Sequence, residues 1–135
     1  MQTEILELAK YRMEKAKECL ADAQDAFEED RWANSINRSY YAMFHATRAL
    51  LALDSFDSKK HSSIIGYFNQ YYIASSKVDS QYYQMLSNAF RVRNKTDYDD
   101  FYIVDRDETE KQLNHAISFV NFMEGYIEFD RIVES

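Results

Sequence analysis

The chain contains no proline and only two glycines among its 135 residues. A β-rich domain needs turn-forming residues between many short strands, so their scarcity argues against such a domain. Long helices with short connections are what this composition allows. The hydrophobic share of 46% and the charged share of 29% are typical of a globular protein and not of a disordered one. At this length we expect residues 1–135 to form a single domain.

Cysteine is almost absent as well, since Cys19 is the only one. It cannot form a disulfide within the chain, and its place beside Leu20 in an amphipathic segment indicates a packed thiol rather than a catalytic one. No apolar run is long enough to cross a bilayer, and the charged residues 1–10 do not have the pattern of a signal peptide. The expected compartment is therefore the cytoplasm, without a membrane partner.

Sequence signatures of cofactors and metals are missing too. Two glycines cannot build the glycine-rich loops that bind nucleotides. The histidines, His45, His61 and His115, lie far apart, and no Cys/His spacing typical of zinc occurs. We therefore expect no cofactor and no metal. The net charge of −7 argues against a general nucleic-acid-binding protein, so any contact with RNA would be local, in a cleft.

What the sequence does contain is helical periodicity. Apolar residues recur at steps of three and four over residues 3–29, 32–53, 61–72 and 107–128, and in a further segment that begins near residue 80. The segment 32–53 is apolar over so much of its circumference that we expect it to be central, or to bury a second face against another subunit. The first segment has a predicted core-facing stripe of Ile5, Leu8, Arg12, Ala16, Leu20, Ala23 and Phe27.

Short connections make successive long helices antiparallel. The predicted fold is therefore all-α, an up-and-down four-helix bundle with one extra short helix. The 11 tyrosines and 9 phenylalanines follow the helical spacing. Core packing explains them better than a platform for stacking bases.

The stretch 91–100 is the most polar part of the chain. It places Arg91, Arg93 and Lys95 before Asp97 and further acidic residues. On a helix, Arg93 and Asp97 would lie one turn apart on the same face. Taken alone, this pattern is explained by an ion pair at a helix end.

Three segments occur in an informative order. Residues 38–46 read Arg-Ser-Tyr-Tyr-Ala-Met-Phe-His-Ala, residues 60–68 read Lys-His-Ser-Ser-Ile-Ile-Gly-Tyr-Phe, and residues 93–99 read Arg-Asn-Lys-Thr-Asp-Tyr-Asp. These segments resemble three motifs of HEPN domains (higher eukaryotes and prokaryotes nucleotide-binding). Residues 38–46 resemble the Tyr-Tyr-Ala core of the second helix, and residues 60–68 resemble the Lys-His-Ser segment that follows it. Residues 93–99 resemble the Arg-x-x-x-Asp-Tyr-Asp ending of the third helix. The resemblance extends over residues 9–128.

This resemblance implies a helical bundle that often forms a homodimer. In many HEPN domains an arginine, often followed by a polar residue, precedes a histidine by four to six positions. Two such motifs meet across the dimer and cleave RNA without a metal. Arg93 and Asn94 match the first two positions, but Tyr98 stands where the histidine would follow. A phenol with an ordinary pKa near 10 is a poor general base at neutral pH.

The first function implied by the resemblance is a binding module. Similar HEPN proteins pair with a minimal nucleotidyltransferase in toxin–antitoxin or related two-component systems. The module would hold a nucleotide or RNA near Arg93, with Arg91 and Lys95 as further binding candidates. In the family, a tyrosine near the motif can accept a nucleotidyl group from the partner, and Tyr98 and Tyr102 are the candidates here.

Two alternatives stay open. One is a metal-independent endoribonuclease of weak or selective activity, in which Arg93 stabilises the charge of the phosphorane while Asn94, Asp97 or Tyr98 assists. The other is a purely structural helical dimer without a ligand. In either case Tyr40 and Tyr41 are expected to pack in the core or at the seam of a dimer, and His61 to form a hydrogen bond at a helix start.

Overall fold

The computed structural model describes the backbone of residues 2–134 and the side chains of residues 3–128. Within that part of the chain every regular element is a helix: α1 Gln2–Glu28, α2 Trp32–Ala52, α3 His61–Phe68, the π-helical turn η1 Asn69–Ile73, α4 Ser80–Tyr98 and α5 Arg106–Glu134. None of the helices described there is both long and apolar enough to cross a membrane. The prediction of an all-α bundle is confirmed.

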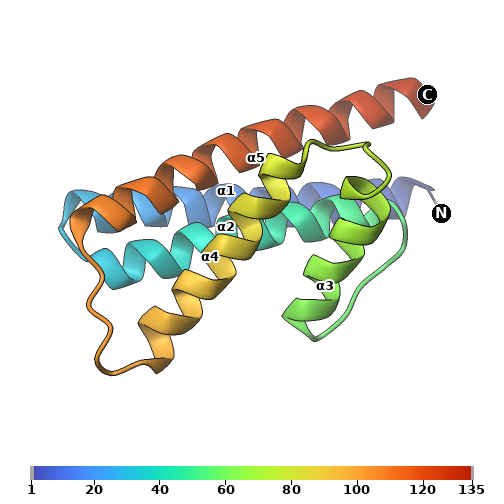
Figure 1. Ribbon diagram of the computed structural model, residues 1–135. Coiled ribbons are helices and arrows are strands. Elements are labelled where there is room, and N and C mark those ends of the chain that lie inside the picture. The colour runs from blue at the N-terminus through green and yellow to red at the C-terminus, as the bar shows by residue number, and fades with distance from the viewer. Residues whose placement is uncertain (1, 135) are drawn as a thin grey trace.

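The long helices alternate in direction along the chain, so both ends of the chain lie at the same end of the bundle (Figure 1). Helices α1, α2 and α5 run nearly side by side, whereas α4 crosses them obliquely and α3 forms a short extra layer. Helix α2 packs against α1, α3, α4 and α5. The central position expected from its broad apolar circumference is therefore confirmed.

Helices α1 and α2 meet through small side chains. Small residues at a helix contact let two backbones approach closely. The buried alanines are Ala9, Ala16, Ala23 and Ala26 on α1, and Ala42, Ala46, Ala49 and Ala52 on α2.

This alanine contact corrects the stripe predicted for the first helix. Leu8 is 41% exposed, whereas its neighbour Ala9 is buried, and Met13 and Ala26 are buried as well. The buried face is thus rotated from the predicted one. The physical reason is that close packing against α2 selects the face with small side chains, not the face with the largest apolar ones.

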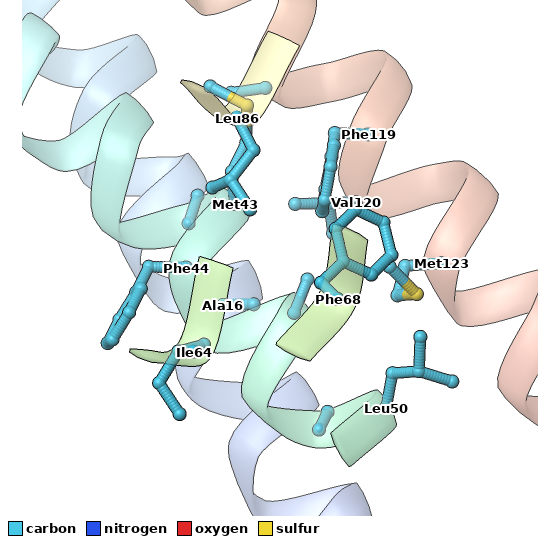
Figure 2. Packing of buried hydrophobic residues seen from close by; sticks show 14 of the residues in the cluster. Ala16, Met43, Phe44, Leu50, Ile64, Phe68, Leu86, Phe119, Val120 and Met123 are labelled. Atoms are coloured by element: carbon cyan, nitrogen blue, oxygen red, sulfur yellow. The ribbon is translucent and has the colours of Figure 1, made fainter. Parts of the chain in front are cut away.

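The larger core side chains come from several helices at once (Figure 2). Met43 and Leu50 of α2 are buried together with side chains of α3, α4 and α5. The most completely buried of these partners are Ile64, Phe68, Leu86, Phe119, Val120 and Met123. Burying one such side chain stabilises the fold by roughly 1.5–3 kcal/mol, so this cluster holds the short helix α3 in place.

Asp57, in the loop before α3, joins three parts of the fold. Its carboxylate accepts from Arg12 of α1 at 3.1 Å and from Arg48 of α2 at 2.9 Å. Arg12, the charged member of the predicted stripe, is only 8% exposed and also donates to the carbonyl of Arg48 at 3.2 Å. The buried charge of Arg12 is therefore paired with a carboxylate that itself stays accessible to water.

We predict that Asp57→Asn lowers the free energy of unfolding by about 1–2 kcal/mol, because Arg12 would stay buried without its charged partner. Urea denaturation followed by circular dichroism measures this change. The matched control is Asp100→Asn in an exposed turn, which we expect to stay within about 0.5 kcal/mol of the wild type. Equal stabilities of the two variants would contradict this account of Asp57.

Candidate functional site

Arg93 lies on the inner face of α4 and is 7% exposed. Its guanidinium carbon is 5.1 Å from the ring centre of Tyr40 and 5.3 Å from that of Tyr41. One guanidinium nitrogen also donates to the Tyr41 hydroxyl at 3.2 Å. A cation over aromatic faces is attracted by the ring quadrupole, more strongly where water is excluded. The polar stretch of α4 and the Tyr-Tyr pair of α2 therefore form one cluster, although they are 52 residues apart.

Asp97 is the carboxylate next to this guanidinium. The one-turn spacing does produce an ion pair, with 3.7 Å between Arg93 Nη1 and Asp97 Oδ2. The amide of Asn37 also reaches Asp97 Oδ2, at 3.5 Å. Both distances are long, and Arg93 Nε is buried without a hydrogen-bond partner among the described residues. The hydrogen-bonding capacity of Arg93 is thus only partly used.

Arg38 is a second cation at the same ring, and the sequence analysis did not identify it as a site residue. Its guanidinium carbon is 5.2 Å from the ring centre of Tyr41. It donates to the side-chain oxygen of Asn37 at 3.0 and 2.6 Å and contacts the sulfur of Cys19 at 3.8 Å. No carboxylate among the described residues pairs with it. Its position three residues before Tyr41 on one helix face was the signal that could have identified it.

Two histidines also adjoin Tyr41. The ring of His61, the first residue of α3, is 5.8 Å from Tyr41, and its Nδ1 lies 2.8 Å from the Tyr40 hydroxyl. The hydrogen bond expected for His61 at a helix start is confirmed. The ring of His45 is 5.9 Å from Tyr41, and its Nδ1 is buried with no hydrogen-bond partner in the part of the chain that the structure describes. Burial lowers the pKa of both histidines, and nearby arginines lower it further. Both are therefore neutral near pH 7.

The other predicted site residues lie elsewhere. Arg91 and Lys95 are exposed, and two residues along a helix turn the side chain by about 200°. They therefore face away from Arg93, and the Lys95 amine lies 5.6 Å from the ring centre of Tyr102. Tyr98 is 76% exposed. Over the described residues, no hydrogen bond or ring contact joins it to Arg93.

Asn94 is half-buried and has no side-chain hydrogen bond in the part of the chain that is described. The structure thus brings Arg93 and Asp97 together, but not the rest of the predicted set. Among the described side chains, no group of three or more histidine, cysteine or acidic residues is arranged to hold a metal ion.

The cluster coincides with the segments that suggested a family. Residues 9–126 match the sequence profile of the HEPN domain. The chain belongs to the HEPN domain family. Arg93 is thus placed against the Tyr-Tyr-Ala segment of a HEPN fold, and the resemblance noted from the sequence is confirmed.

Several HEPN relatives match along most of their length. A UPF0332 protein of Thermotoga maritima is 27% identical over 121 residues, which cover 90% of this chain and 92% of that protein. "Putative toxin MJ0142" of Methanocaldococcus jannaschii is 26% identical over 132 residues, covering 94% and 90%. A UPF0332 protein of Archaeoglobus fulgidus is 33% identical over 113 residues, covering 81% and 86%.

We predict that His45 makes this HEPN domain less stable in acid. Burial lowers its pKa from 6.5 to about 4. The unfolded chain therefore binds a proton below pH 6.5, whereas the folded protein does not until about pH 4. Stability is complete above pH 6.5 and falls as the pH drops toward 4, by about 2 kcal/mol from this residue between pH 7 and pH 5.

Urea denaturation at pH 7 and pH 5 tests this pH dependence by comparing wild type with His45→Gln. Between pH 7 and pH 5, the loss in the free energy of unfolding should be about 2 kcal/mol smaller in the variant than in the wild type. Because His61 and His115 also have lowered pKa values, we expect both proteins to lose some stability between pH 7 and pH 5. An equal loss of stability in the two proteins would show that His45 is not the responsible group.

Proposed function

We propose that this HEPN protein is the partner of a minimal nucleotidyltransferase in a toxin–antitoxin or related two-component system, and that Arg38 and Arg93 hold a phosphate group of a nucleotide or RNA. The observation that carries the proposed phosphate binding is the pair of guanidinium groups at Tyr41. Among the described residues only one of them, that of Arg93, is paired with a carboxylate, Asp97. The word toxin in the names of two relatives supports the role in such a system.

The present hydrogen-bond acceptors of these arginines are weak enough for phosphate oxygens to replace them. Arg38 donates to a neutral amide and a thiol, which are weaker acceptors than a phosphate. Arg93 has an unpaired nitrogen and a long ion pair. Guanidinium groups present several donors in a plane and match phosphate geometry well. On a chain with a net charge of −7, such a site would attract an anion only locally.

The endoribonuclease alternative has less support. Tyr98, at the position of the family histidine, is exposed and away from Arg93. Asp97 is paired with Arg93, so its carboxylate is already engaged by a cation and is poorly suited to take a proton from a ribose hydroxyl. No observation specifically favours a purely structural dimer. Binding without efficient cleavage is therefore the function that we propose.

We predict that Arg38→Ala and Arg93→Lys each weaken binding of a short oligoribonucleotide, or of AMP, by about tenfold or more. Arg93→Lys keeps the charge but loses the planar donors, and a hydrogen bond to a charged group contributes roughly 1.5–3 kcal/mol. Fluorescence anisotropy and calorimetry measure the affinities, and circular dichroism checks the fold.

The matched control for this experiment is Arg91→Ala. Arg91 is an exposed arginine on the opposite side of α4. The affinity of the Arg91→Ala variant for either ligand should therefore stay within about twofold of the wild-type affinity. A wild-type protein that binds neither ligand, or an Arg91→Ala variant as weak as the others, would refute the phosphate site. Incubating the oligoribonucleotide without divalent metal tests the alternative, since cleavage lost in Arg93→Lys would make the protein a ribonuclease.

For nucleotidyl transfer, the two candidate tyrosines differ in accessibility. Tyr98 is 76% exposed at the end of α4. Tyr102 is half-buried beneath the Lys95 amine, and burial and the charges of Glu108 and Asp105 raise its pKa. We therefore propose Tyr98 as the acceptor. Its hydroxyl oxygen would attack the α-phosphorus of a nucleoside triphosphate, form an O–P bond, release pyrophosphate and lose its proton to a base of the transferase.

We predict that Tyr98→Phe abolishes this modification and that Tyr102→Phe retains it, because only an accessible hydroxyl can reach the triphosphate. Co-expression with a nucleotidyltransferase encoded beside the chain, followed by intact-mass spectrometry, would show the gain of one nucleotidyl group. Modification that persists in Tyr98→Phe and disappears in Tyr102→Phe would reverse the assignment. A transferase that does not bind the chain would remove the proposed partnership itself.

A further inference from the structure

A second cationic surface lies where α2 is followed by the loop to α3. A hollow there is lined by Phe44, Arg48, Asp57, Ser58, Lys59 and His61. It does not include Arg38 or Arg93. Lys59 is exposed and forms no ion pair within the described part of the chain.

Asp57 does not make this hollow acidic. Its carboxylate lies 3.1 Å from Arg12 and 2.9 Å from Arg48, and it also accepts from the backbone N–H of Ser58 at 2.8 Å. Burial raises the pKa of Asp57, but these hydrogen bonds and charges outweigh that effect and lower it. Of the residues that line the hollow, Arg48 and Lys59 are cations and Asp57 is an anion, which leaves a charge of +1 there on a chain of net charge −7.

The Tyr40 hydroxyl decides which nitrogen of His61 carries the hydrogen. Tyr40 is fully buried, and the described residues offer its hydroxyl one hydrogen-bond partner, His61 Nδ1 at 2.8 Å. Burial raises the pKa of Tyr40, so the phenol keeps its proton and donates it. Nδ1 is then the acceptor, and the hydrogen of the neutral imidazole is on Nε2. Phe44 stacks on the same imidazole at 4.2 Å and fixes its plane.

The Nε2–H edge of His61 is the one left for the hollow. Nδ1 is turned toward the buried hydroxyl of Tyr40, and this is the side-chain hydrogen bond that His61 makes within the described residues. The hollow therefore combines a fixed neutral donor with the free amine of Lys59 and with the guanidinium of Arg48, whose Nε and Nη2 already donate to Asp57. Several donors with a positive charge and no unpaired carboxylate are what a phosphate group requires.

We propose that this hollow binds a phosphate group through His61, Lys59 and Arg48, with Tyr40 as the positioning residue that holds the His61 donor. The site is separate from the phosphate site proposed at Arg93. The ligand class is a phosphate ester, either the terminal phosphate of a nucleotide or a phosphodiester of RNA. The two sources share the same recognition by hydrogen bonds and charge.

Histidine NMR tests this site in the intact chain. Long-range ¹⁵N–¹H spectra distinguish the two imidazole tautomers and follow His61 during titration with inorganic phosphate, AMP and a short oligoribonucleotide. We expect a saturable shift of the His61 Nε2–H resonance with inorganic phosphate. Lys59→Ala should weaken binding about threefold to tenfold, whereas Lys111→Ala, a matched exposed lysine on α5, should not.

Two further variants separate this site from its surroundings. Tyr40→Phe should mix the His61 tautomers and weaken phosphate binding, whereas a merely structural role of the hydroxyl would leave the tautomer unchanged. Arg93→Lys should leave the His61 titration with inorganic phosphate intact even if the site proposed at Arg93 is lost.

The affinities for AMP and for the oligoribonucleotide then identify the natural ligand. Tighter binding of AMP indicates a nucleotide, and tighter binding of the oligoribonucleotide indicates RNA. The proposal is wrong if phosphate shifts no His61 resonance, or if Lys59→Ala binds it as tightly as wild type.

Discussion

The enclosure of α2 by the other helices is the constraint on which the rest of the structure depends. Helix α2 contacts α1, α3, α4 and α5, and most of its side chains are buried. One strip on its surface remains only half-buried, and it carries polar and aromatic side chains: Asn37, Arg38, Tyr41, His45 and Arg48. Asp97 meets Asn37, Arg93 meets Tyr41, and Asp57 meets Arg48 on this strip. The candidate site and the second hollow both lie along this strip.

Two arginines are buried to a similar extent but differ in how completely their hydrogen-bond donors are paired. Arg12 and Arg93 are 8% and 7% exposed. Arg12 has a carboxylate at 3.1 Å and a backbone carbonyl at 3.2 Å, so its charge is well paired and stabilises the fold. Arg93 has a carboxylate at 3.7 Å, a phenol and two aromatic faces, and one nitrogen without a partner. A rigid cation with unused donors is suited to an anionic ligand, because little ordering is left to be done on binding.

Helical periodicity and local chemistry predicted much of this fold. The broad apolar face of residues 32–53 correctly indicated a central helix. Local chemistry also acts at the start of α4, where the carboxylate of Asp79 accepts from the N–H of Gln81 at 2.9 Å. The orientation of α1 was predicted less well. Periodicity counts apolar residues and ignores their size, whereas close packing on α2 favoured Ala9 over Leu8. In the polar stretch, spacing identified the pair of Arg93 with Asp97 because that pair is local.

By itself the sequence determined the helical class, the approximate helices, the family and the arginine at the centre of the candidate site. These properties depend on composition, on residues within one or two helical turns and on motifs in order. Only the tertiary structure decided that the guanidinium of Arg93 packs on the rings of Tyr40 and Tyr41. The same holds for the contact of Arg38 with the ring of Tyr41 and for the hydrogen bond between His61 and Tyr40. Those contacts join residues far apart in the chain. Their geometry follows from how α3 and α4 pack on α2, and no local pattern of charge or hydrophobicity encodes that packing.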